Sequence, residues 1–235
     1  MQEINNELFP DCDVYYFKNG EEWHMLRSKG IGGSEISVIL NRNKYKSRYE
    51  LWLEKTNRKK PDVVYNESID MGNRLEPVLI NLFYGIYKNE IKEIIDTKEI
   101  SLSRKDKPYM RANLDGAFID KDGHLTILEI KTSTIKNFEM LEEWGIDEDG
   151  NEKIPFSYYC QCLWYMAVTG AKKVVLYAML NIPWGRHPRQ ETRIATINYE
   201  DVREDVEYII ERAEEFWKEV ENNIMPIVVN RKYEI

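Results

Sequence analysis

Cysteine is scarce in this 235-residue chain, which has three, at positions 12, 160 and 162. An odd number of cysteines argues against a disulfide framework, so free thiols are expected. Cys160 and Cys162 lie two residues apart in a segment that we predict to be helical, where side chains at this spacing point to different faces. The cysteines therefore do not predict a zinc or iron–sulfur site.

Long hydrophobic runs are also missing. The two longest uninterrupted apolar runs, 162–168 and 174–180, have seven residues each, whereas a helix needs about 20 apolar residues to cross a bilayer. The first residues contain neither a basic segment nor an apolar one, so no secretion signal is recognisable. We therefore expect a cytoplasmic protein that does not enter a membrane.

A basic net charge is the third missing feature. The chain has 33 Lys and Arg against 41 Asp and Glu, a net charge of −8, which taken alone argues against a nucleic-acid partner. The charges are segregated, however, because residues 27–60 carry +7 while residues 139–152 and 200–221 together carry −14. Solvated surfaces would explain these stretches equally well, so their role depends on the residues around them.

The apolar content, 43% of the residues with six Trp, is sufficient for the core of one domain. Periodicity and turn residues predict an α/β (α+β) chain. Helices are expected over 21–28, 34–40, 47–57, 68–87, 155–168 and 200–220, strands over 91–102, 113–120, 124–131, 173–180 and 191–198, and an irregular acidic segment over 139–151. Ser34 is expected to cap its helix directly after a Gly-Gly turn.

The second and third of these strands are predicted to form a hairpin that carries the chemistry. Their connection, residues 121–123, ends in a glycine, and a three-residue loop of this kind pairs Asp120 with His124. The same register places Asp115 directly opposite Glu129, where cross-strand side chains lie close enough to share one cation.

A change of one residue in this register would break the site, because a two-residue loop would place Ile130 opposite Asp115. With the three-residue loop, strand alternation puts Glu129 and Lys131 on one face. Facing carboxylates repel each other unless a cation lies between them, and their oxygens favour Mg²⁺ or Mn²⁺ over zinc. Lys131 would then position or activate the attacking water, or neutralise phosphate charge. The alternative is a surface ion pair of Glu129 with Lys131, with Asp115 as a turn residue.

Further motifs occur in order along the chain. They read Trp23-His24-Met25-Leu26-Arg27, Gly32-Gly33-Ser34-Glu35, Gly72-Asn73-Arg74-Leu75-Glu76, Asp115 with Glu129-Ile130-Lys131, and Tyr158-Tyr159-Cys160-Gln161. Together, over about residues 21–180, they resemble the YqaJ-type viral recombinases, a lambda-exonuclease-like family of the PD-(D/E)XK nucleases. The resemblance implies a restriction-endonuclease-like core, with a central mixed sheet flanked by helices, in one nuclease domain over 1–235. The last strand and acidic helix, 190–222, are less diagnostic.

The resemblance also implies a metal centre. The implied Mg²⁺ ligands, for which Mn²⁺ would substitute, are Glu76, Asp115, Glu129 and the Ile130 carbonyl, and the implied catalytic residues are Glu76, Asp115, Glu129, Lys131 and Gln161. Taken alone, Glu76 would more often be a solvated helix residue, and a buried Gln161 would only need a polar partner. Some related nucleases hold an iron–sulfur cluster on four cysteines, which this chain lacks, so the cluster-free branch is favoured.

Arg27 and Ser34 match the positions at which this family holds the terminal 5′-phosphate. A serine at a helix start beside a Gly-rich turn offers free N–H groups to an anion, and the arginine would add a bidentate contact. A simple helix-cap role for Ser34 is compatible with this interpretation. The basic stretch over 42–60 then becomes a wall for the DNA backbone.

The expected function is a Mg²⁺-dependent deoxyribonuclease, a 5′-to-3′ exonuclease on double-stranded DNA ends that acts in phage-type homologous recombination by single-strand annealing. One alternative is a PD-(D/E)XK endonuclease or repair nuclease without end dependence, and another is a catalytically silent module that binds DNA or a partner. The resemblance implies a single-strand annealing protein as partner and a homotrimeric ring. The basic and acidic stretches would supply complementary surfaces between subunits.

Overall fold

The computed structural model describes residues 8–61, 67–148, 150, 152–185 and 187–227. The strands are β1 (Cys12–Tyr16), β2 (Ile91–Ile95), β3 (Ile100–Arg104), β4 (Arg111–Ala112), β5 (Gly116–Asp120), β6 (Leu125–Thr134), β7 (Lys173–Ile182) and β8 (Arg189–Asn198). The helices are α1 (Gly20–Ser28), α2 (Ile36–Ile39), α3 (Arg48–Lys55), α4 (Glu67–Ile86), α5 (Phe138–Glu142), α6 (Phe156–Thr169) and α7 (Arg203–Glu221), with 3-10 turns η1 (Gly33–Glu35) and η2 (Tyr199–Asp201).

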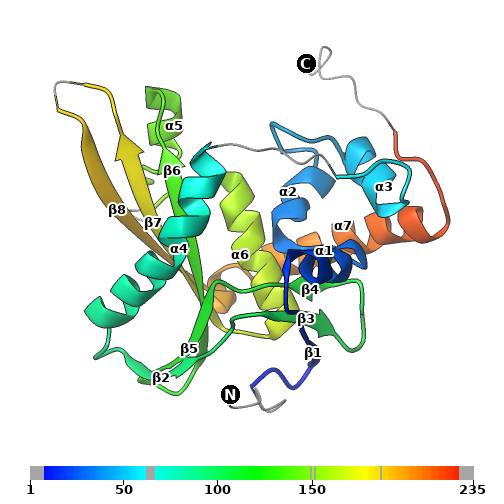
Figure 1. Ribbon diagram of the computed structural model, residues 1–235, viewed down its shortest axis with the longest axis horizontal. Coiled ribbons are helices and arrows are strands. Elements are labelled where there is room, and N and C mark those ends of the chain that lie inside the picture. The colour runs from blue at the N-terminus through cyan, green and yellow to red at the C-terminus, as the bar shows by residue number, and fades with distance from the viewer. Residues whose placement is uncertain (1–7, 62–66, 149, 151, 186, 228–235) are drawn as a thin grey trace.

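The strands form two sheets (Figure 1). The larger has the order β2-β5-β6-β7-β8 and the smaller the order β1-β3-β4. Within the larger sheet, β6 and β7 are parallel while the other neighbouring pairs are antiparallel, so the sheet is mixed. The predicted fold class, a mixed sheet with flanking helices, is confirmed.

Helices α4 and α6 cover opposite faces of β6, and Figure 1 shows them on its two sides. Leu128 and Ile130 belong to a buried cluster that includes α4 residues. Ile127 points to the opposite face of the strand and packs in the main core with α6 residues. Because successive strand side chains point to opposite faces, Glu129 lies on the same side as Ile127, beneath α6. The alternation therefore carries an acidic side chain into the interior.

The predicted hairpin register is confirmed. Gly116 pairs with Leu128 in β5 and β6, the Asp120 N–H donates to the His124 carbonyl at 3.0 Å, and Gly123 is left-handed at φ +88°. Extending this register by one residue places Asp115, which directly precedes β5, opposite Glu129.

Two predicted elements are wrong in their extent. The segment 91–102 is two strands in different sheets, because the chain turns at 96–99 with Glu99 left-handed at φ 60°. The helix expected over 34–40 is the η1 turn followed by the short α2, and the cap position is Gly32. Ser34 lies inside the turn, so its predicted role as helix cap is wrong.

Other differences are smaller. The acidic segment expected to be irregular contains α5, which begins after Asn137 because the Asn137 side chain accepts from the Met140 N–H at 2.9 Å. Strand β1 was not predicted. The main core takes residues from both sheets, among them Leu102 and Ile127. Within the described part of the chain, no helix combines the length and apolar character that a membrane span needs.

Candidate active site

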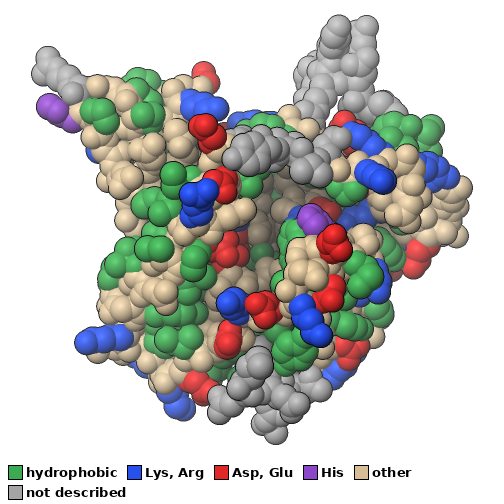
Figure 2. Space-filling view, viewed as in Figure 1, with side chains coloured by type: hydrophobic (Ala, Val, Ile, Leu, Met, Phe, Trp, Pro, Cys, Tyr) green, Lys and Arg blue, Asp and Glu red, His purple; other side chains and the backbone are tan. Residues whose placement is uncertain are grey.

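A cavity of about 940 Å³ lies between α4, the turn that joins β2 to β3, and the segment from α1 to η1. Figure 2 shows this side of the molecule hollowed at its centre, with acidic and basic side chains around the hollow. The predicted residues that line the cavity are Arg27, Ser34, Glu76, Asp115, Lys131 and Gln161. Side chains that are far apart in the sequence therefore share one space, which is lined by the Glu76 and Asp115 carboxylates and by the Arg27 guanidinium.

Glu129 lies next to Asp115 and Lys131 and is fully buried, with 0% exposure. Its carboxylate forms an ion pair with Lys131 Nζ, yet both carboxylate oxygens are buried without a well-formed hydrogen bond. Burial and the nearby Asp115 carboxylate raise the pKa of Glu129 to about 8, against the lowering effects of Lys131 and of the Tyr165 hydroxyl. The surface ion pair that the sequence left open is thus excluded, since this pair is in the interior.

Asp115 is half-buried and is fixed by its partner strand, because its Oδ2 accepts from the Ile130 N–H at 2.8 Å. Burial raises the pKa of Asp115, while Lys131 and the Ile130 N–H oppose the rise. The backbone of Ile130 therefore holds the carboxylate in place through its N–H group, and the Ile130 side chain is buried in the cluster under α4.

Glu76 reaches the same place from α4. Burial and the Asp115 carboxylate raise the pKa of Glu76 to about 7, while Lys131 lowers it. The solvated surface role that the isolated residue would have predicted does not apply, because Glu76 is half-buried and lines the cavity.

Lys131 is the cation of this cluster. Burial lowers the pKa of Lys131, but the Glu129 and Asp115 carboxylates raise it by more, so the net value lies well above the ordinary one. Its Nζ also lies 5.1 Å from the centre of the Tyr158 ring. The side chain therefore remains an ammonium group at neutral pH, a donor and not a proton acceptor.

The carboxylate oxygens of Glu76, Asp115 and Glu129 are ligands that suit a hard divalent cation. The described residues nevertheless include no group of three or more His, Cys, Asp or Glu already arranged to hold a metal. Glu129 has two buried oxygens without well-formed hydrogen bonds, and a single ammonium group offsets three neighbouring carboxylates. Buried carboxylates of this kind require compensation, and oxygen donors select Mg²⁺ or Mn²⁺. The residues that would hold the ion are Glu76, Asp115 and Glu129.

Gln161 does have a polar partner, and this partner is a residue that the sequence analysis missed. Gln161 Nε2 donates to the Tyr165 hydroxyl at 2.6 Å, and Tyr165 also lines the cavity. The polar partner that a buried Gln161 would need is thus a side chain of the same helix. The spacing of four residues on one helix was the signal that could have identified Tyr165.

Gly33 explains how the η1 turn approaches α6 so closely. A Cβ on Gly33 would lie 2.9 Å from Gln161 Cγ and 3.2 Å from Tyr165 Cε1. The glycine therefore allows the segment that carries Ser34 to lie against the helix that carries Gln161.

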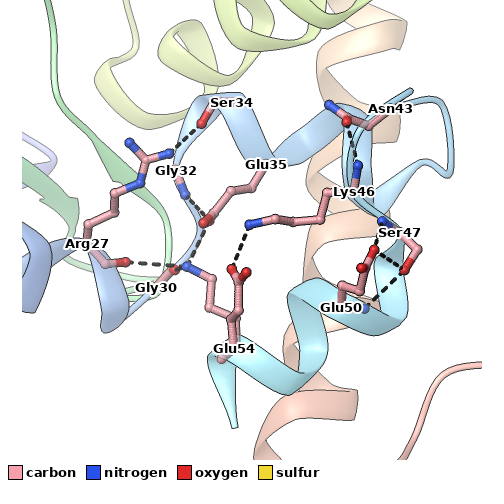
Figure 3. A network of polar contacts seen from close by, with 11 residues as sticks. Arg27, Gly30, Gly32, Ser34, Glu35, Asn43, Lys46, Ser47, Glu50 and Glu54 are labelled. Carbon is pink, nitrogen blue, oxygen red and sulfur yellow. Dashed lines mark hydrogen bonds and ion pairs between the residues drawn. The ribbon is translucent and has the colours of Figure 1, made fainter. Parts of the chain in front are cut away.

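The predicted phosphate contacts, Arg27 and Ser34, also line this cavity and bond to each other (Figure 3). Arg27 Nη2 donates to Ser34 Oγ at 2.5 Å, and the Arg27 guanidinium lies 5.1 Å from the centre of the Trp23 ring. The partners of Glu35 are Gly32 and Lys55: its Oε2 accepts from the Gly32 N–H at 2.9 Å and pairs with Lys55 Nζ at 2.9 Å. Arg27 is therefore left with donor capacity at the cavity wall, as an anion site requires.

Four basic residues of the stretch over 42–60, Lys44, Lys46, Arg48 and Lys55, form ion pairs with acids of the same chain. Arg48 contacts Glu219 of the acidic helix α7 at 2.9 Å, and Lys44 contacts Glu143 of the acidic segment at 2.7 Å. In these two pairs folding brings opposite charges together within one chain, so the predicted contact of the basic and acidic stretches between subunits would have to use other residues.

Comparisons with known proteins agree with this geometry. Residues 22–172 match the YqaJ-like viral recombinase domain. An uncharacterized protein, YqaJ of Bacillus subtilis (strain 168), is 35% identical over 150 residues, which are 64% of this chain and 42% of that relative. The chain thus spans less than half the length of that relative.

The fold is similar to that of an alkaline exonuclease, LHK-Exo, from Laribacter hongkongensis, with a TM-score of 0.55 and 20% identity over 87% of this chain and 94% of that one. A structure of LHK-Exo in complex with dAMP gives a TM-score of 0.60 and 18% identity over the same shares. Because the family match covers residues 22–172, well over half of the sequence, the chain belongs to the YqaJ-like viral recombinase domain family.

Proposed function

We propose that this protein is a Mg²⁺-dependent deoxyribonuclease that removes nucleotides in the 5′-to-3′ direction from double-stranded DNA ends, in phage-type recombination by single-strand annealing. The observation that carries the proposal is that one cavity is lined both by Glu76, Asp115 and Lys131 and by Arg27 with Ser34. An end-dependent nuclease needs both parts, a centre that cleaves and an anchor for the terminal phosphate. The dAMP complex of LHK-Exo adds support, since a nucleotide binds to a protein of this fold.

In this proposal each side chain has a defined task. Glu76, Asp115, Glu129 and the Ile130 carbonyl would hold Mg²⁺, and the bound ion would supply Lewis-acid chemistry toward the scissile phosphate and the attacking water. Lys131, held as an ammonium group, donates toward the phosphate and the attacking water. Gln161 fixes the Tyr165 hydroxyl beside Glu129.

Arg27 and Ser34 act as the anchor in the same cavity. Their side chains bind the terminal 5′-phosphate and so place the next phosphodiester at the carboxylates. The distance between this anchor and the carboxylates would then set which bond is cut.

Digestion of three linear or circular substrates tests the proposal. Linear duplexes with 5′-phosphate or 5′-hydroxyl ends and a covalently closed circle are incubated with and without Mg²⁺, with Glu129→Gln as the inactive control. We expect Mg²⁺-dependent nucleotide release that is fastest from 5′-phosphorylated ends and absent from the circle. Cleavage of the circle would indicate an endonuclease or repair nuclease instead, and no cleavage of any substrate would indicate a silent binding module.

We also propose a homotrimer and an interaction with a single-strand annealing protein, both on the strength of the family resemblance. Static light scattering at micromolar concentration should give three times the 28.0 kDa of one chain. A monomeric mass together with processive digestion would exclude the ring.

A further inference from the structure

Glu76 is the one proposed metal ligand that comes from a helix, so its reach depends on how closely α4 lies on the sheet. Two glycines lie at the contact between α4 and the sheet, on either side of Glu76 along the helix. Gly72 of α4 faces Thr132 of β6, and Gly116 of β5 lies beneath Tyr84 of α4. The helix is thus in close contact with the sheet about one turn before Glu76 and two turns after it.

Gly116 leaves no space for a larger residue. A Cβ at this position would lie 2.7 Å from Tyr84 Oη and 3.3 Å from the Leu128 side chain. The Tyr84 hydroxyl is itself held in place, because it donates to the Ala117 carbonyl at 3.2 Å. A methyl group on Gly116 would therefore push the Tyr84 hydroxyl away from the Ala117 carbonyl and disturb the contact between α4 and the sheet.

Gly72 makes a milder contact of the same kind. A Cβ at this position would lie 3.0 Å from Thr132 Oγ1, which is closer than carbon and oxygen atoms normally approach. A third glycine in α4, Gly85, has no atom within 4 Å of such a Cβ. The helix therefore carries glycines both at the sheet contact and away from it.

We propose that Gly116 and Gly72 are positioning residues, which set the separation of α4 from the sheet at which Glu76 meets Asp115 at the divalent cation. This inference rests on the proposed function, because it assumes that the carboxylates bind the metal. A purely structural glycine would affect the stability of the fold, whereas a positioning glycine also affects the affinity for the ion.

The test compares Gly116→Ala, Gly116→Ala with Tyr84→Phe, and Gly85→Ala, each by calorimetric titration with Mn²⁺ and by thermal melting without metal. Gly116→Ala should bind Mn²⁺ about 10–100-fold more weakly, as is typical when the support of a metal ligand is disturbed. The added Tyr84→Phe substitution removes the clashing oxygen and should restore most of the affinity. Gly85→Ala should bind as the wild type does and melt slightly higher, since alanine favours the helix.

The outcomes separate this inference from the proposed function. Wild-type protein that binds no Mn²⁺ would overturn both, whereas a folded Gly116→Ala variant with wild-type Mn²⁺ affinity would overturn the inference alone. If Gly116→Ala does not fold, the milder Gly72→Ala substitution replaces it, with Gly72→Ala and Thr132→Ala together as the matched rescue. Wild-type affinity in folded Gly72→Ala would then count against the proposal, and weakened binding that the rescue reverses would support it.

Discussion

Two glutamates of this protein, Glu35 and Glu129, are both withdrawn from solvent and both lie next to a lysine, yet their environments differ. Glu35 forms an ion pair with Lys55 at 2.9 Å and accepts from the Gly32 N–H at 2.9 Å. Burial raises the pKa of Glu35, but Lys55 and Arg27 lower it by more, so the net shift is downward. For Glu129 the balance is reversed, and its pKa rises to about 8.

The difference lies in how well the protein compensates the negative charge of each glutamate. Glu35 has its counter-charge and its hydrogen bond inside the protein, so its negative charge is stabilised by folding. Glu129 shares Lys131 with Asp115 and lacks well-formed hydrogen bonds. A perturbed pKa of this kind indicates a functional site, whereas burial alone does not.

The largest effects are expected when each of the two glutamates is replaced by glutamine, which tests the difference between them directly. Glu129→Gln should abolish Mg²⁺-dependent nucleotide release while the protein remains folded, because the change removes a buried charge. Glu35→Gln should lower the free energy of unfolding by about 3 kcal/mol, because it leaves the Lys55 ammonium buried without its carboxylate. Urea denaturation and a cleavage assay check both variants, and a stable Glu35→Gln variant without activity would reverse the assignment.

Replacement of Lys131 tests the role of the ammonium group that pairs with Glu129. Lys131→Ala should reduce the turnover rate by about 10²–10⁴-fold and leave duplex affinity nearly unchanged, because affinity comes from many backbone contacts. Single-turnover cleavage and equilibrium binding measure the two effects separately. A variant that binds ~100-fold more weakly but cuts normally at saturation would make Lys131 a docking residue.

Replacement of Arg27 tests the proposed anchor for the terminal phosphate. Arg27→Ala should reduce the preference for 5′-phosphorylated over 5′-hydroxyl ends by about 10–100-fold, the loss of a charge-assisted contact. Arg58→Ala is the matched control, since Arg58 belongs to the same basic stretch but stacks 4.5 Å from the centre of the Trp52 ring. Equal losses of end preference in the two variants would contradict a specific phosphate anchor.

The smallest expected effect is a dependence of stability on pH in the metal-free protein. The folded-state pKa values of Glu129 and Glu76 are raised from 4.5 to about 8 and about 7, so between these limits the folded protein holds protons that the unfolded chain releases. The free energy of unfolding should therefore fall as the pH rises from about 5 to 8. Urea denaturation in the presence of a chelator should show this slope, and Glu129→Gln should flatten it. An unchanged slope in that variant would exclude Glu129 as its source.

The parts of the fold that local sequence determines were predictable. Loop length and a left-handed glycine at position 123 fix the register of the hairpin, and this register places Asp115 opposite Glu129. The break between β2 and β3 was not predictable, because the turn over 96–99 contains neither glycine nor proline. Its left-handed Glu99 is held by a distant contact, in which the Phe17 N–H donates to the Glu99 carbonyl at 3.0 Å.

Which polar residues would meet in one cavity could be predicted from the sequence, but their environment could not. The sequence indicates that Glu129 and Lys131 share a face, but the burial of that face depends on α6 packing over it. The pairing of Arg48 with Glu219 joins residues that are 171 positions apart, which no local pattern reveals. The segregation of charge along the chain therefore predicted that the basic and acidic stretches interact, but not that these pairs form within one subunit.

The three buried cysteines provide a way to follow the opening of the molecule. Burial raises the pKa of Cys12 to about 11 and that of Cys160 to about 12, so an alkylating reagent meets unreactive thiols in the native state. Cys12 lies in an edge strand of the small sheet and Cys162 in the core helix α6. The order in which these thiols become labelled would report whether the small sheet detaches before the core unfolds.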